Sequence, residues 1–149
     1  MQSIRFDDGY KEFMINDDPS RVIRFNPADY GILERFDTAS KEMMQELETI
    51  GNDFDLNPDG SPRVPESELE EAAKLLAKTR KVICDKVDYI FGSPVSEVAF
   101  GTQSPLSSVK GLPLFERFIN AARPFIEKEV MAEQKASQKR IEKYTKQVR

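Results

Sequence analysis

The residues best spaced for chemistry are oxygen-bearing side chains in the middle of the chain. Asp55, Asn57, Asp59 and Gly60 are followed by Glu66, which matches the calcium-loop pattern D-x-[DN]-x-[DN]-G-x5-E. Carboxylate and amide oxygens at the first, third and fifth positions, with a glutamate at the twelfth, are the ligands that a hard cation requires. A metal site made of Asp55, Asn57, Asp59 and Glu66 is therefore one hypothesis.

Prolines in the same segment argue against calcium binding. Pro62 occupies the eighth position of the loop, where a backbone amide pairs with a partner loop, and proline has no amide hydrogen. Pro58 and Pro65 stiffen the segment, and no second loop of this kind occurs in the sequence. Because Asp, Asn, Pro and Gly are also ordinary turn residues, we expect residues 53–66 to connect two helices, and we expect no metal or cofactor.

Missing residue types exclude several enzyme classes. The chain has no histidine, which excludes Ser-His-Asp and Cys-His catalysis and any metal site with a histidine ligand. The sequence has no glycine-rich phosphate loop, and no spacing singles out a catalytic pair among its 26 acidic residues. The single cysteine, Cys84, cannot form an internal disulfide and lies on the apolar side of a predicted helix. We therefore predict a protein that is not an enzyme.

Charge is distributed unevenly along the chain. The net charge is −4, but residues 132–149 contain six Lys or Arg and two Glu, so this tail carries +4 and the remainder carries −8. The acidic remainder argues against nucleic acid as a partner, because phosphate contacts need clustered cations. The tail could contact an acidic partner surface, or it could be a solvated helix end.

The sequence also bears on membranes and location. No apolar run approaches the ~20 residues that span a bilayer, so we expect no membrane insertion. The N-terminus lacks the apolar centre of a signal peptide. We therefore expect the protein to be cytosolic where it is made.

The N-terminal residues are predicted to form three short β-strands. Apolar side chains alternate with polar ones in three runs, at Ile4 and Phe6, at Phe13 and Ile15, and at Ile23 and Phe25. Asp8-Gly9 separates the first two runs and is a typical two-residue hairpin turn. We expect an antiparallel β-meander over residues 3–25, with helices covering one face.

Two long helices should follow and form an antiparallel hairpin. Asn26-Pro27 is a helix start, because asparagine caps free amides and proline suits the first position. Apolar residues then recur every three or four positions from Leu33 to Phe54, and again from Leu69 to Ile90. Each Phe-Gly pair, at Gly92 and Gly101, should end a helix with glycine at positive φ. A short helix capped by Ser93 is expected between these two glycines.

The last predicted helix opens at Leu112-Pro113 and has an apolar face that continues to Val130. Pro124 lies inside this pattern and should kink or split the helix. Beyond Met131 the apolar stripe thins to a charged tail. The predicted fold is therefore mainly α with a small β-meander (α+β). It forms one domain, with a helical core over residues 27–131 and a charged tail over residues 132–149 that is either a solvated helix or partly disordered until something binds it.

The order of these parts resembles the small tail assembly chaperones of long-tailed phages and prophages of Gram-positive bacteria. The resemblance covers most of the chain and rests on structural patterns without a catalytic signature. The matching residues are the opening SIRFDDGYKEFMIND and RVIRFNP, the Asn26-Pro27 helix entry, Ile83-Cys84 leading to Tyr89-Ile90-Phe91-Gly92, Phe100-Gly101, and Leu114-Phe115-x-x-Phe118-Ile119.

This resemblance implies a non-enzymatic protein that binds the tape-measure protein during tail assembly. It would cover the apolar helices of that protein until tail-tube subunits polymerise around it, and would then be absent from the mature virion. The implied location is the cytoplasm of the bacterial host. A homo-oligomer is also compatible with the sequence.

We expect the partner to bind a surface made of apolar residues of the last helix and cations of its tail. The apolar residues could equally belong to the core, because helical spacing is also what burial requires. This hypothetical partner surface consists of Phe115, Phe118, Ile119, Phe125 and Ile126 with the tail cations Lys139, Arg140 and Lys143. The alternatives to a chaperone are a permanent structural component of the phage tail and a calcium-binding helical module.

Overall fold

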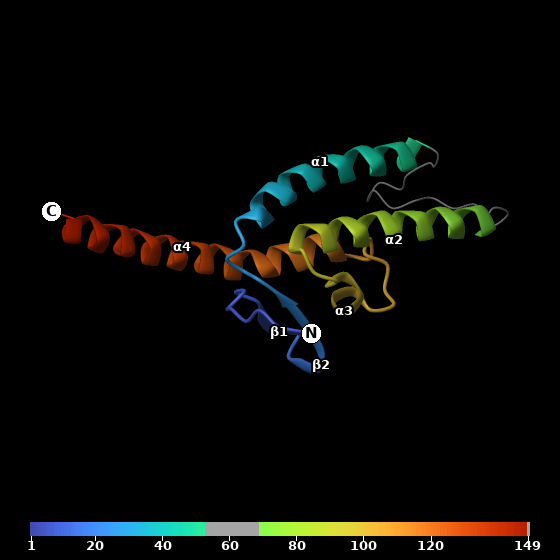
Figure 1. The fold of residues 1–149 in the computed structure, drawn as a ribbon. Coiled ribbons are helices and arrows are strands. Elements are labelled where there is room, and N and C mark those ends of the chain that lie inside the picture. The colour runs from blue at the N-terminus through green and yellow to red at the C-terminus, as the bar shows by residue number, and fades with distance from the viewer. Residues whose placement is uncertain (53–68, 149) are drawn as a thin grey trace.

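The computed structural model describes residues 1–52 and 69–148 of the protein (Figure 1). The chain is mainly helical, with a small antiparallel hairpin near its N-terminus, as the sequence predicts. The described strands are β1 (Lys11–Ile15), β2 (Asp18–Phe25), β3 (Ser108–Val109) and β4 (Leu112–Pro113). The described helices are α1 (Gly31–Asn52), α2 (Leu69–Phe91), α3 (Ser96–Phe100) and α4 (Leu114–Val148).

The N-terminal sheet has two strands, so the predicted three-stranded meander is wrong. β1 pairs antiparallel with β2, and Phe13 lies opposite Ile23. The turn between the strands is Asn16-Asp17, where both residues have positive φ angles of 51° and 59°. Positive φ at both positions is the signature of a type I′ turn, which matches the twist of the strands that it joins. Residues 1–10 form no strand.

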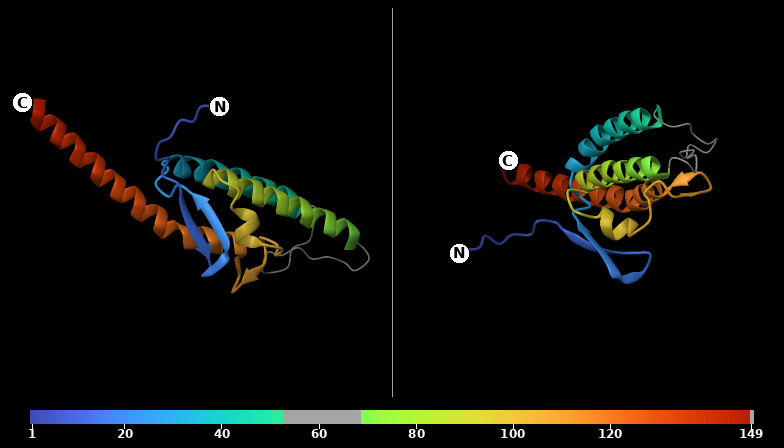
Figure 2. Two further views of the ribbon diagram at one scale, coloured as in Figure 1. Left: turned by 60° about the horizontal axis from the view of Figure 1, so that its bottom comes forward. Right: turned by 90° about the vertical axis from the view of Figure 1, so that its right-hand side faces the viewer.

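α1 and α2 run antiparallel and side by side, which agrees with the predicted helical hairpin (Figures 1 and 2). α1 buries Ala39 and Met43, and α2 buries Ile83 and Val87. Helix α1 begins four residues later than predicted, because Asn26–Tyr30 form a turn before it. Within this turn the Asn26 Oδ1 accepts the Ala28 amide at 2.9 Å.

The buried stripe of α1 differs by one residue at its start. Leu33 was expected to begin the stripe, but its side chain is 58% exposed. Ile32 is buried in its place and lies four residues before the half-buried Phe36. The inward-facing residues of α1 therefore still recur at steps of three and four, but the stripe begins at Ile32 and not at Leu33.

The junction of α2 and α3 is capped by an unexpected residue. Gly92 has a positive φ of 65° as predicted, and the Ser93 amide donates to the Asp88 carbonyl at 3.2 Å, which is the bond of a Schellman terminus. Ser93 does not cap α3; its hydroxyl donates to the Arg24 carbonyl. Instead, the Asp88 carboxylate accepts the Ser96 amide at 2.8 Å and the Ser96 hydroxyl at 3.0 Å.

α4 is one continuous helix that passes through Pro124, so it is not split there. Pro124 and Asn120 are both exposed. The Asn120 carbonyl, which loses its amide partner at this proline, can therefore be hydrated. The C-terminal half of α4 projects away from the rest of the molecule (Figures 1 and 2).

A chain of aromatic rings joins the hairpin to the helices. The Phe25 ring lies 4.9 Å from that of Phe13 and 5.0 Å from that of Phe91. Phe91 in turn lies 5.2 Å from Phe118 of α4, and Phe118 lies 5.9 Å from Phe100 of α3. Such pairs add about 1 kcal/mol beyond the area that they bury. This cluster fixes α4 against both the sheet and α2.

Candidate partner-binding surface

The structure divides the apolar residues of the hypothetical partner surface between two faces of α4. Phe115, Ile119 and Ile126 recur every three or four residues or their multiples, and so share one face. Phe118 and Phe125 are seven residues apart and share another, which faces the β-hairpin. The single surface that the sequence suggested is therefore two surfaces.

The first face borders an open groove between α1 and α4. The groove has a volume of about 610 Å³. Its apolar side chains include Phe36 and Met43 from α1 and Phe115 and Ile119 from α4. The Arg123 guanidinium lies over the Phe36 ring, 6.0 Å from its centroid, a distance at which a cation still interacts with an aromatic face.

Charged and polar side chains also line this groove. Glu48 of α1 and Glu116 and Arg123 of α4 are exposed at it. Phe115 is only 8% exposed and Ile126 only 9%, so both contribute mainly to the core. Ile119 is half-buried and is the member of the hypothetical surface that remains accessible in this groove.

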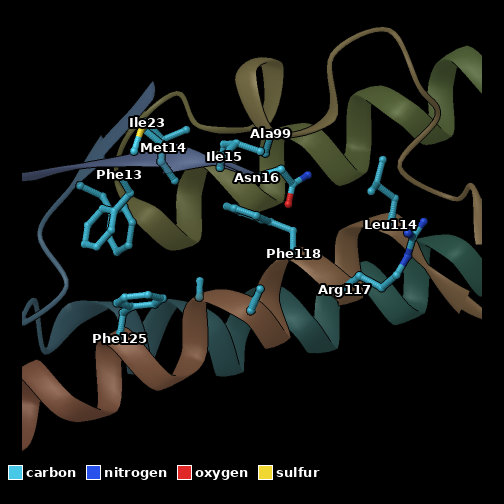
Figure 3. Close-up of a pocket in the computed structure, with 13 residues that line it drawn as sticks. Phe13, Met14, Ile15, Asn16, Ile23, Ala99, Leu114, Arg117, Phe118 and Phe125 are labelled. Atoms are coloured by element: carbon cyan, nitrogen blue, oxygen red, sulfur yellow. The ribbon is translucent and has the colours of Figure 1, made fainter. Parts of the chain in front are cut away.

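The second face borders a smaller groove between β1 and α4, of about 270 Å³. Figure 3 shows Phe13, Ile15 and Asn16 on one side of it and Phe118 and Phe125 on the other. The Phe13 and Phe125 rings meet edge to face at 5.5 Å. Phe125 is nevertheless 53% exposed, so this groove is open to solvent.

One arginine closes an end of the second groove, beside Leu114 (Figure 3). The Arg117 Nη2 donates to the Ser107 carbonyl at 2.9 Å. Its Nε atom is buried and has no hydrogen-bond partner among the described residues. The guanidinium is therefore held by the loop before α4, and its buried Nε donor is left unpaired.

The cationic residues of the hypothetical surface lie apart from the apolar ones. Lys139, Arg140 and Lys143 are all exposed, and so is every residue of α4 from 131 to 146. The helical rise places Lys139 roughly 20 Å beyond Ile126. The exposed tail also carries three large apolar side chains, those of Met131, Ile141 and Tyr144.

Two ion pairs involve the elements that border these grooves. Lys11 Nζ of β1 lies 3.0 Å from Glu129 Oε2 of α4, and Lys86 of α2 pairs with Glu42 of α1. The hydrogen bond to Glu42 raises the pKa of Lys86, although desolvation opposes this shift.

The single cysteine, Cys84, lies on α2. Burial raises the pKa of its thiol, although a hydrogen bond with Ser96 opposes this shift.

An arginine links the start of α1 to the end of α2. Arg35 Nη2 donates to Asp29 Oδ2 at 2.7 Å, and Arg35 Nε donates to the Ile90 carbonyl at 3.2 Å. Asp29 Oδ1 also accepts the Gly31 amide at 2.8 Å. Desolvation works to raise the pKa of Asp29, but the hydrogen bonds from Arg35 and Gly31 outweigh it and lower the pKa.

The hypothetical calcium ligands Asp55, Asn57, Asp59 and Glu66 lie outside the described residues. Within residues 1–52 and 69–148, no group of three acidic or cysteine side chains is placed to hold a metal ion. No helix of the described part is both long and apolar enough to cross a membrane.

Comparisons with known proteins give no relative for this chain. No family model matches it, and neither a curated protein nor a solved structure does. The function proposed below therefore rests on the geometry of the chain and on the resemblance described for its sequence.

Sequence reasoning missed the contribution of α1 to the first groove. The periodicity of Phe36 and Met43 predicts that both face inward, and it does so correctly. Periodicity does not say which other helix they face, or whether the two helices close on each other. The position of Arg123 over Phe36 has no signal in the sequence at all.

Proposed function

We propose that this protein is a non-enzymatic assembly chaperone that binds an amphipathic helix of the tape-measure protein during phage tail assembly. The observation that carries the proposal is the open groove between α1 and α4, with Phe36, Met43 and Ile119 in its lining. An amphipathic helix that lays its apolar face into such a groove is a recurring mode of recognition. The identity of the partner rests on the family resemblance of the sequence.

The mixed lining of the groove supports a helical partner over a small molecule. The apolar side chains can receive the apolar face of a helix, while Glu48, Glu116 and Arg123 are exposed at the same groove and can meet its polar flanks. An apolar centre with a polar rim is the usual anatomy of a protein interface.

The tail of α4 offers a second contact. Its exposed cations include Lys139, Arg140 and Lys143, and its exposed apolar residues include Ile141 and Tyr144. The cations would attract an acidic segment of the partner and raise the association rate. The apolar side chains would then extend the contact beyond the body of the protein.

A chaperone of this kind acts transiently. We propose that the protein binds the tape-measure protein in the cytoplasm of the bacterial host and is displaced as tail-tube protein polymerises. It would then be absent from the mature virion. A permanent structural component of the tail would instead remain in purified particles at a fixed copy number.

Co-expression tests the proposal. The tape-measure protein is produced alone and together with this chain, and soluble species are analysed by size exclusion with light scattering. We expect the partner alone to aggregate and the pair to elute as one soluble complex. A partner that is soluble alone, or that does not co-elute, overturns the proposal.

A further inference from the structure

We propose that the N-terminal segment of one copy, residues 3–7, adds as a third strand to the β-hairpin of a second copy, giving a strand-exchanged dimer. The acceptor is the outer edge of β1 together with the groove between β1 and α4. This surface is distinct from the α1–α4 groove assigned to the partner helix.

The donor segment is apolar, extended and uncovered. Ile4 is 90% exposed and Phe6 is 76% exposed, and Arg5 lies between them. Residues 1–6 belong to no strand or helix and make no hydrogen bond to other described residues. Alternating apolar and polar side chains are the pattern of a strand with one buried face. This segment therefore has the sequence of a β-strand but pairs with no strand of its own chain.

The turn after the segment directs it away from its own hairpin. Gly9 has a positive φ of 79°, whereas Asp8 does not. Two-residue hairpin turns need positive φ at both residues or at the first. The observed conformation is therefore not a hairpin turn, and the segment continues beyond the end of the sheet (Figure 2).

Contacts hold this turn in place. The Asp7 carboxylate accepts the Gly9 amide at 2.9 Å, and the Asn26 side chain donates to the Asp8 carbonyl at 3.4 Å. A Cβ on Gly9 would lie 2.7 Å from the Asn26 Nδ2, so the close approach requires glycine.

The hairpin has one open edge. The Arg21 guanidinium of β2 donates to the Val98 and Ala99 carbonyls, and the Ser93 hydroxyl donates to the Arg24 carbonyl, so residues 93–99 cover the outer side of β2. Among the described strands, β1 pairs with β2 alone. An uncovered edge of this kind is a template for another strand.

The apolar groove lies beside this edge. Phe13 and Ile15 of β1 line it from the sheet, and Phe125 lines it from α4 (Figure 3). Ala121 of α4 also lines it. A strand added to β1 would point every second side chain into this groove. Because Ile4 and Phe6 are two residues apart, both can enter it at once, beside Phe13 and Ile15, in either strand direction.

A second copy of the chain is the partner that would use both the free N-terminal segment and the free edge of β1. The donor segment and β1 each span five residues. Each copy has one donor and one acceptor, so two copies related by a two-fold axis satisfy both exchanges and close the assembly. A foreign strand on the same edge would leave Ile4 and Phe6 exposed.

Mass in solution tests the proposal on the full chain. We expect light scattering to give twice the chain mass of 17.0 kDa, and the Ile4→Asp/Phe6→Asp variant to return to the mass of one chain. Both residues are exposed, so the variant should keep its helical circular dichroism signal. The matched control, Arg5→Ser, should remain a dimer because Arg5 would face away from the groove. A monomeric wild type, or a dimer that survives the double substitution, overturns the proposal.

Mixing two variants tests whether the exchange uses the groove. Ala121→Lys should block the acceptor while its donor segment stays intact, and it should also be a monomer alone. Mixed with Ile4→Asp/Phe6→Asp, it should form a heterodimer, because one donor and one open acceptor remain. If the mixture stays monomeric, or if Ala121→Lys alone remains a dimer, the groove is not the acceptor.

Discussion

At the scale of single residues, the phenylalanines of α4 differ in burial although they follow the same apolar pattern in the sequence. Phe115 is 8% exposed and belongs to the core cluster, whereas Phe125 is 53% exposed at the mouth of the smaller groove. Their helical spacing predicts that both are apolar contacts. It does not separate a side chain that holds the fold from one that is open to a partner.

Truncating these two residues should therefore have unequal effects. We expect Phe115→Ala to lower the free energy of unfolding by about 3 kcal/mol, because it leaves a cavity in the core. Phe125→Ala should lower it by about 1 kcal/mol, because half of that ring is already in water. Urea denaturation measures both values. Equal losses would mean that the two rings are packed alike.

The Asp29–Arg35 pair predicts part of the acid response of the protein. The pKa of Asp29 is lowered in the folded state, so ionised Asp29 stabilises the fold at pH values above its ordinary pKa of 3.8. This contribution is lost as the pH falls through the lower pKa of the folded state.

Asp29→Asn should make the stability less dependent on pH in this acid range. It should also lower the stability at pH 7 by about 1 kcal/mol, because the charged hydrogen bonds to Arg35 and Gly31 are weakened. Thermal unfolding of both proteins between pH 3 and 7 measures the difference. Parallel curves for the variant and wild type would show that Asp29 does not contribute.

At the scale of elements, α3 depends on a residue of the preceding helix. The short helix has no side-chain cap from its own N-cap residue, Val95. The Asp88 carboxylate of α2 accepts both the amide and the hydroxyl of Ser96 in its place. Asp88 therefore fixes the corner that brings Phe100 of α3 against Phe118.

Asp88→Ala should lower the free energy of unfolding by about 1–2 kcal/mol, the usual cost of losing a cap. Asp85→Ala is the matched control, because Asp85 is an exposed aspartate one turn earlier in the same helix. Chemical denaturation compares the two variants. A control as destabilised as Asp88→Ala would assign the effect to the loss of charge from α2.

Most helices were predictable because their patterns are long and repeat many times. The antiparallel pair α1 and α2, the glycine ends at Gly92 and Gly101, and the start of the last helix within two residues all follow from apolar periodicity and capping. The prediction of a first strand was wrong because the alternation at Ile4 and Phe6 shows only that one face of the segment can be buried. It does not show which strand the segment pairs with, or whether that strand belongs to the same chain. The Asp8-Gly9 turn failed because this residue pair permits a hairpin turn but does not require one: only Gly9 has a positive φ, and the Asn26 side chain donates to the Asp8 carbonyl and lies against Gly9.

The candidate site was less predictable than the fold. The sequence correctly places Ile119 and the tail cations on α4, but it does not show that Phe118 and Phe125 face the sheet while Ile119 borders the α1 groove. That division depends on how α4 crosses elements distant in sequence, and periodicity within one helix carries no such information.

At the scale of the whole molecule, an acidic body carries a basic helix that projects from it. Near the base of the projection, Lys11 pairs with Glu129 and Val130 packs against the core, whereas residues 131–146 are exposed. We therefore expect the fold not to depend on the tail, whose exposed cations can then meet a partner.

Removing residues 132–149 should leave the body folded and change how fast it binds. We expect an almost unchanged melting temperature, because the deleted residues bury little surface. Removal of the +4 tail should slow association with the partner and weaken its dependence on salt, since exposed charges act through screened fields. Stopped-flow binding at two ionic strengths measures this. A large loss of thermal stability would mean that the tail is part of the core.

The most direct test of the account is partner binding by two variants of α4. Ile119→Lys places a charge in the α1–α4 groove, and Phe125→Lys places the same charge in the smaller groove between β1 and α4. Circular dichroism first establishes that both variants keep the fold, and calorimetry then measures their affinity for the tape-measure protein. Our account predicts at least about a tenfold loss for Ile119→Lys, worth roughly 1.4 kcal/mol, and little change for Phe125→Lys. Equal affinities for Ile119→Lys and wild type would contradict the assignment of this groove to the partner helix.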